Sequence, residues 1–131
     1  MTRILNRTIV GAIASFAILP IGQLLGQQIQ TREQYIYVLQ VSPRFQEEAS
    51  WTETENAVLG RHFDRLAQAA KAGQVILAGR TNEPLDKTFG LVIFEADSET
   101  AAREFMQADP AVNAGLMTAT LHSYAVALQR K

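Results

Sequence analysis

The order in which the hydrophobic period changes along the chain is the feature that most constrains its fold. Runs rich in β-branched and aromatic residues have the composition of strands, and Ser42-Pro43 stops the first of them. Between these runs, apolar residues recur at helical spacing. Strands are therefore expected at about residues 34–41, 74–79, 89–94 and 118–128, with a hairpin joining the second to the third.

The segment after the first predicted strand carries the signals of both helix ends. Thr52 and Glu55 have the spacing of a capping box, and Ser50 with Glu53 offers the same motif slightly earlier. The first helix is expected to begin near Thr52. Gly73 marks its end, because glycine commonly follows the last helical turn.

The second helix is expected to begin at Asp97 or Ser98 and to end before Pro110, because the residue before a proline is pushed out of the helical region. The elements then follow in the order β-α-β-β-α-β. This order predicts an α+β fold of the ferredoxin-like (split βαβ) kind, with both helices on one face of a four-stranded sheet. A length of 131 residues fits one such domain.

Both faces of the predicted strands are apolar. In the first strand, Tyr35, Tyr37 and Leu39 alternate with Ile36 and Val38, and the second and third strands repeat this pattern. Two short helices can cover only one face of such a sheet, so the other face is expected to meet an identical sheet. We therefore expect a homodimer that forms a two-sheet barrel or sandwich.

The start of the chain differs from the rest. Arg3 and Arg7 carry the only charges among residues 1–31, and a long apolar stretch follows them. A basic start before an apolar centre is typical of a secretory signal peptide, here residues 1–26 with Gly26 as one candidate cleavage point. A membrane anchor and a buried helix are the alternatives. Cleavage predicts a periplasmic or secreted protein, and a membrane contact is expected only without cleavage.

The composition excludes several classes of function. The 12 Lys and Arg residues are balanced by 13 Asp and Glu and form no basic run, so nucleic acid is not an expected partner. Without cysteine, the chain cannot form disulfides, Cys-ligated zinc sites, iron–sulfur clusters or thiol nucleophiles. Only His62 and His122 could bring imidazole to a metal site, and we expect neither a metal nor a cofactor.

His62 and Asp109 are the strongest candidates for chemistry. His62 falls on the apolar stripe of the first helix, so its ring should point toward the sheet. There it is either a core-edge histidine bonded to a backbone carbonyl or a general acid or base. Asp109 precedes Pro110 at the expected end of the second helix. This is ordinary turn chemistry, but the carboxylate could also orient the His62 ring.

Three further residues are candidates for substrate binding. Arg80 follows the second strand, where it either clamps a carboxylate or remains solvated. His122 lies within the last strand, as a structural, interface or pocket-lining residue. Arg44 lies with Trp51 in the long loop before the first helix, which is either a lid over a cleft or plain surface.

Several segments together resemble the YCII-related (YciI-like) domain family over about residues 33–128. The resemblance implies a dimeric α+β barrel similar in shape to muconolactone isomerase. It also implies that His62 and Asp109 match the histidine and aspartate of the family's proposed active site. Arg80 stands where the family usually has proline, and Ser123-Tyr124 departs from its aromatic ending, which leaves the substrate open. The segments are Arg61-His62-Phe63-Asp64-Arg65-Leu66, Lys71 to Arg80, Gly90 to Phe94, Ser98 to Ala101 and Asp109 to Leu116.

Three functions fit these observations. The first is a cofactor-independent enzyme for proton transfer or elimination on a small anionic or aromatic-derived compound, in line with the dehydrochlorination chemistry of a few family members. Its acid or base is His62, its orienting group Asp109, and its binder of negative charge Arg80. The second is a non-catalytic dimer that binds or senses a small ligand. The third is a purely structural exported dimer.

Overall fold

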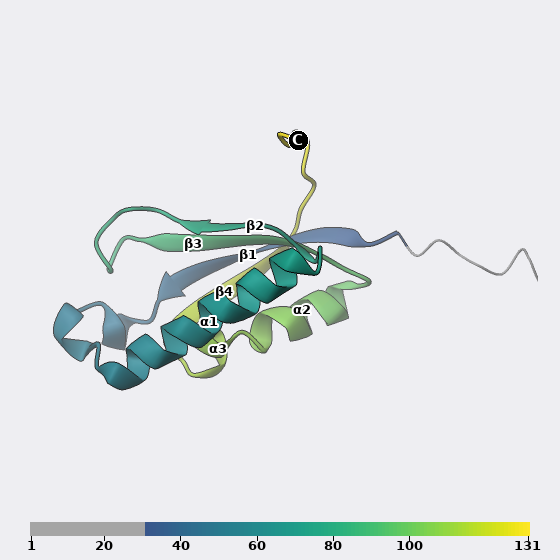
Figure 1. The fold of residues 1–131 in the computed structure, drawn as a ribbon. Helices are drawn as coiled ribbons and strands as arrows, with labels where there is room; N and C mark the ends of the chain where they lie inside the picture. Colours follow the sequence, from purple (N-terminus) through teal and green to yellow (C-terminus); the bar gives the residue numbers. More distant parts are fainter. Residues whose placement is uncertain (1–30) are drawn as a thin grey trace, which may run out of the picture.

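The computed structural model describes residues 31–131, and the expected signal peptide or anchor lies outside them. Within this part the chain forms one sheet, two longer helices, one short helix and two short 3-10 turns (Figure 1). No helix among residues 31–131 is long and apolar enough to cross a membrane. The elements are β1 (Glu33–Val41), η2 (Pro43–Phe45), η3 (Glu48–Ser50), α1 (Glu53–Lys71), β2 (Val75–Arg80), β3 (Phe89–Ala96), α2 (Glu99–Gln107), α3 (Pro110–Asn113) and β4 (Met117–Ser123).

The strands form an antiparallel sheet in the order β2-β3-β1-β4. β1 lies between β3 and β4, so that Tyr37 is opposite Val92 on one side and Leu121 on the other. The helices lie on one face of this sheet (Figure 1). The predicted β-α-β-β-α-β order and the ferredoxin-like α+β fold are therefore confirmed.

Local sequence signals set the ends of both longer helices. Thr52 caps α1, and its N–H donates to Oε2 of Glu55 at 2.9 Å, which completes the predicted capping box. After α1, Gly73 has a φ of +82°, the left-handed conformation that glycine adopts without strain. The Ser98 hydroxyl accepts the N–H of Ala101 at 3.1 Å and caps α2.

The second helix ends before Pro110, as predicted, but Asp109 does not lie at its end. α2 ends at Gln107, whereas Pro110 is the first residue of α3 and Asp109 is the N-cap of that short helix. Proline suits this position because it has no N–H to donate and its fixed φ matches the first helical turn. The backbone of Asp109 is non-helical, with φ −60° and ψ 125°, which separates α2 from α3.

The last strand is shorter than its sequence pattern indicates. β4 ends at Ser123 instead of residue 128. The register pairs Ser123 with Tyr35, and β1 begins at Glu33, so residues 124–128 have almost no neighbouring strand to pair with. The C-terminal segment instead leaves the sheet on the side away from the helices (Figure 1).

The main core lies between the sheet and the helices. Tyr35, Tyr37 and Leu39 of β1 point into it, and none of them is more than 4% exposed. The rings of Tyr37 and Phe94 meet edge to face, with centroids 5.5 Å apart. Burial of each such large side chain stabilises the fold by roughly 1.5–3 kcal/mol. This packing also fixes where the Tyr37 hydroxyl lies.

The other face of the sheet has no helix over it. Ile36, Val38, Leu91 and Ile93 are half-buried there, and Leu77 is 55% exposed. Both faces are thus apolar, as the sequence pattern indicates. A homodimer through this helix-free face stays a prediction.

Candidate active site

The apolar face of α1 holds His62 against the protein interior. The buried residues Val58 and Leu66 lie one turn before and one turn after it, and the histidine itself is 4% exposed. α1 also packs against α3, so His62 lies beside the residue that caps α3. The inward direction expected from the helical spacing is therefore found.

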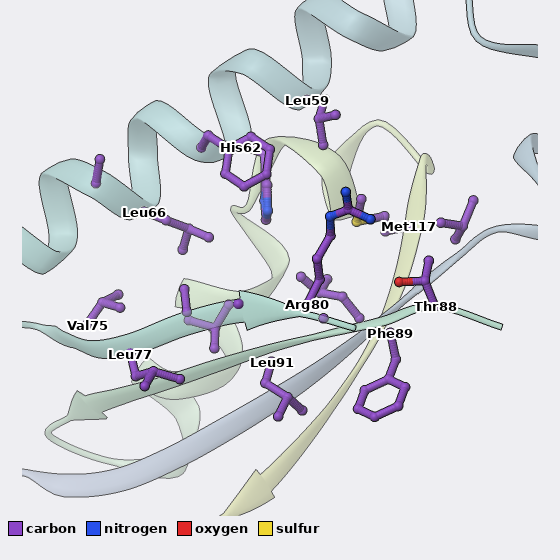
Figure 2. Close-up of a pocket in the computed structure, with 18 of the residues that line it drawn as sticks. Leu59, His62, Leu66, Val75, Leu77, Arg80, Thr88, Phe89, Leu91 and Met117 are labelled. Carbon is purple, nitrogen blue, oxygen red and sulfur yellow. The ribbon is translucent and has the colours of Figure 1, made fainter. Parts of the chain in front are cut away.

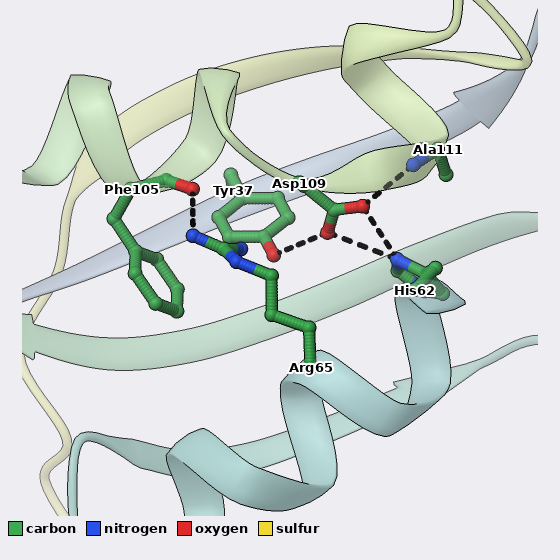
Figure 3. A network of polar contacts seen from close by, with 6 residues as sticks. All are labelled: Tyr37, His62, Arg65, Phe105, Asp109 and Ala111. Atoms are coloured by element: carbon green, nitrogen blue, oxygen red, sulfur yellow. Dashed lines mark hydrogen bonds and ion pairs between the residues drawn. The ribbon is translucent and has the colours of Figure 1, made fainter. Parts of the chain in front are cut away.

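Asp109 is fully buried and accepts hydrogen bonds from three elements (Figure 3). Its Oδ1 accepts the N–H of Ala111 at 2.9 Å, which is the cap of α3. Its Oδ2 accepts the hydroxyl of Tyr37 at 2.8 Å. Nδ1 of His62 lies 2.7 Å from Oδ1 and 2.9 Å from Oδ2. β1, α1 and α3 thus converge on one carboxylate.

The surroundings of Asp109 keep it ionised. Burial acts to raise the pKa of Asp109, but the hydrogen bond and charge of His62, with the donors Tyr37 and Ala111, outweigh burial and hold that pKa below its usual range. Burial and the neighbouring Asp109 carboxylate raise the pKa of Tyr37 well above its usual value. Tyr37 therefore stays protonated and remains a hydrogen-bond donor.

These protonation states determine which nitrogen of a neutral His62 carries the proton. An ionised carboxylate only accepts hydrogen bonds, so the Nδ1 that faces Asp109 must be the N–H. Nε2 then carries the free lone pair. Within residues 31–131 no protein group hydrogen-bonds to Nε2. The pair thus has the arrangement of a base oriented by a carboxylate.

His62 also lines a cavity of about 810 Å³ between α1 and the β2–β3 hairpin (Figure 2). Its walls are mainly apolar, with Leu59 and Leu66 on the helix side and Val75 on the strand side. Trp51, from the loop before α1, belongs to the same lining. The base is therefore accessible from a space large enough for a small molecule.

Arg80 lies at the same cavity. It is the last residue of β2 and is exposed, and Figure 2 shows its side chain extending from the strand toward α1. Within residues 31–131 it forms no ion pair, so its charge is available to an anion. Thr88, also in the lining, has its hydroxyl bonded to the carbonyl of Thr81 at 2.8 Å. Thr88 therefore supports the hairpin.

The structure does not bring His122 or Arg44 to this site. His122 is opposite Ile36 in the sheet and is exposed on the helix-free face, so the sheet separates it from His62. Arg44 is exposed in η2, with its guanidinium 5.2 Å from the centre of the Phe45 ring, and it does not line the cavity. Of the five predicted site residues, the described part of the chain brings together His62, Asp109 and Arg80.

Two residues of this site were not identified from the sequence. Tyr37 looked like an ordinary inward-facing strand residue, and nothing in its neighbours reveals the bond to Asp109. Arg65 lies three residues after His62 on α1, and its guanidinium reaches the Tyr37 side of the pair (Figure 3). Its spacing from His62 was a usable signal, since residues three apart share a helix face.

No cluster of three His, Cys, Asp or Glu side chains suited to a metal ion occurs in the described part of the chain. The polar groups of the site are one imidazole, one carboxylate, one phenol and two guanidinium groups. These groups can move a proton and bind negative charge.

The fold and the site define a class of protein: a single-sheet α+β domain with a buried His–Asp pair beside an apolar cavity. The family model of the YCII-related domain matches residues 30–121. The chain therefore belongs to the YCII-related domain family. A comparison with curated proteins finds no match to it.

Proposed function

We propose that this protein is a cofactor-independent enzyme that catalyses proton transfer or elimination on a small molecule. The observation that carries this proposal is the orientation of His62, whose Nδ1 is held by Asp109 while the ring lines the cavity. A histidine fixed in this way has one tautomer, and its Nε2 can accept a proton from a bound molecule.

The proposed reaction begins with neutral His62. Nε2 takes a proton from carbon, and the electrons of the broken C–H bond form a carbon–carbon double bond. In an isomerisation the neighbouring carbon already carries a double bond, whose electrons shift to a further carbon, and His62 returns the proton there. In an elimination the bond from the neighbouring carbon to a leaving group breaks, and its electrons depart with that group. The buried Asp109 carboxylate stabilises the imidazolium that forms in either case.

The cavity supports a small, partly apolar and anionic substrate. Its walls favour an aromatic-derived or alicyclic skeleton, and Arg80 offers a positive charge to a carboxylate or enolate. His122 and Arg44 could contact the same molecule only if a second protomer brought them to the cavity. Their substrate-binding role is therefore part of the proposal only in a dimer.

Assembly and location belong to the same proposal. The apolar helix-free face supports a homodimer, and the basic-then-apolar start supports export to the periplasm or the outside by a signal peptide at residues 1–26. An exported dimer that binds or senses a small ligand without turnover is the second candidate, favoured by the apolar character of the cavity.

A turnover screen tests the proposal. The purified protein is incubated with enol-lactones and chlorinated hydroquinones beside the variants His62→Ala and Gln68→Ala. We expect His62→Ala to lower turnover by about a thousandfold, as general acid–base catalysis is worth roughly 10²–10⁴. Gln68→Ala is the matched control, because Gln68 is exposed on the same helix and does not line the cavity. Binding of a compound with no turnover would favour the second candidate. Turnover that survives His62→Ala would contradict the proposal.

A further inference from the structure

Arg65 is held in place by contacts on the side of the His62–Asp109 pair that faces α2. Its Nη2 donates to the carbonyl oxygen of Phe105 at 2.8 Å, and its guanidinium carbon lies 4.2 Å from the centre of the Phe105 ring. Its Nη1 is buried and has no hydrogen-bond partner. Burying a guanidinium with one nitrogen unsatisfied lowers the stability of the folded protein. We therefore expect the charge of Arg65 to interact with another group.

That charge has no carboxylate of its own. Within residues 31–131 Arg65 forms no ion pair. Its guanidinium lies beside the hydroxyl of Tyr37, where its charge acts to lower the pKa of that hydroxyl (Figure 3). The same hydroxyl donates to Asp109. The Tyr37 hydroxyl therefore lies between the guanidinium and the buried carboxylate (Figure 3). Asp109 has 0% of its surface exposed, so water cannot compensate its charge.

We propose that Arg65 is a positioning residue that supplies the counter-charge of Asp109 through Tyr37, so that Asp109 stays ionised whether or not His62 carries a proton. Without such a charge, a neutral His62 would leave Asp109 as an uncompensated buried anion. With it, His62 can release its proton at moderate cost. This role deepens the proposed function, since a general base must be stable in its neutral form.

The other charged groups near His62 do not supply this compensation. On the cavity side, Arg80 and Glu48 belong to the lining and are exposed, so water screens them. On the interior side, the titratable and charged groups around the pair are Tyr37 from β1, Asp109 from α3 and Arg65 from α1. Tyr37 is neutral, which leaves Arg65 as the cation on that side.

NMR titration of the His62 ring in the full-length protein tests the proposal without any substrate. Loss of a nearby cation favours the protonated ring, so in Arg65→Met we expect His62 to bind its proton about tenfold more tightly, or about one pH unit higher. Arg65→Lys, which keeps the charge, should restore the original titration to within about twofold. Arg61→Met is the matched control, because Arg61 is an exposed arginine on the same helix. An unchanged titration in Arg65→Met, or no rescue by lysine, would overturn the proposal.

A stability measurement covers the case in which Arg65→Met folds poorly. If Arg65 compensates Asp109, the drop in the denaturant midpoint caused by Arg65→Met should be much smaller when Asp109 is already Asn. Equal drops in both backgrounds would mean that Arg65 only packs against Phe105, and would refute the counter-charge. Both readouts are independent of turnover, so failure of the substrate screen and failure of this role are distinguishable.

Discussion

Nδ1 of His62 lies 2.7 Å from Oδ1 of Asp109, although 47 positions separate the two residues in the chain. The contact joins the middle of α1 to the N-cap of α3, and the Tyr37 hydroxyl from the central strand binds the same carboxylate. One buried group thus links both layers of the fold and fixes the ring that lines the cavity. The same bond is therefore expected to affect both stability and chemistry.

Stability in acid should depend on Asp109. Because its pKa is lower in the folded protein than in the unfolded chain, the unfolded chain binds more protons in acid. Asp109 therefore makes its full contribution to the free energy of unfolding above about pH 4, and this contribution is lost as pH falls through the lowered pKa. In urea unfolding between about pH 6 and about pH 3, the free energy of unfolding should fall more steeply with pH in the unaltered protein than in Asp109→Asn. Equal slopes would show that Asp109 does not contribute.

The Tyr37 hydroxyl should stabilise the fold through Asp109. Tyr37→Phe removes a buried hydrogen bond to a charged group, and we expect the free energy of unfolding to fall by about 1.5–3 kcal/mol. Tyr35→Phe is the matched control, on the same face of the same strand, because the Tyr35 hydroxyl binds the exposed Glu33. That change should cost less than about 0.5 kcal/mol. Similar losses from the two substitutions would argue against a special role of the Tyr37–Asp109 bond.

The helix-free face should mediate the homodimer. Val38 lies in the central strand on this face, so Val38→Glu should turn a dimer into a monomer by burying a charge at the interface. Gln68→Glu on the exposed side of α1 adds the same charge elsewhere and should leave the dimer intact. Solution scattering at micromolar concentration measures both. A monomeric mass for the unaltered protein would refute the predicted assembly.

Export is tested on the protein made in cells. The basic-then-apolar start predicts that the protein is found in the cell envelope or the medium, with its first peptide beginning close after Gly26. Mass spectrometry of the N-terminal peptide in each fraction measures this. Protein in the membrane fraction that retains Met1 would favour the anchor instead. An intact Met1 peptide in a soluble cytoplasmic pool would contradict export.

Much of the fold followed from local patterns. The capping box at Thr52 and the strand composition act over a few residues, so the sequence displays them directly. The end of β4 could not be predicted in this way, because the residues after Ser123 keep a strand pattern although the neighbouring strand β1 does not extend beside them. The sequence pattern also placed Asp109 at the end of the second helix, whereas it is the N-cap of α3. A proline can follow the end of one helix or begin the next, and the local sequence does not distinguish these two positions.

The candidate site was predictable in part for a similar reason. Helical spacing aims His62 inward, and the family resemblance supplied Asp109 as its partner. The bond from Tyr37 depends on tertiary packing across β1, α1 and α3, which no local pattern encodes. The placement of His122 on the face away from His62 depends on strand register, which its own sequence neighbours do not fix.

The protonation of the two ring nitrogens of His62 distinguishes an oriented base from a purely structural histidine. ¹⁵N NMR of this ring across pH reports which nitrogen carries the proton and where the ring titrates. We expect the neutral ring to be protonated at Nδ1. We also expect Asp109→Asn to shift uptake of the second proton to lower pH, because the substitution removes the charge that favours the imidazolium. A neutral form protonated at Nε2, or a titration unchanged in Asp109→Asn, would contradict an acid–base pair formed by His62 and Asp109.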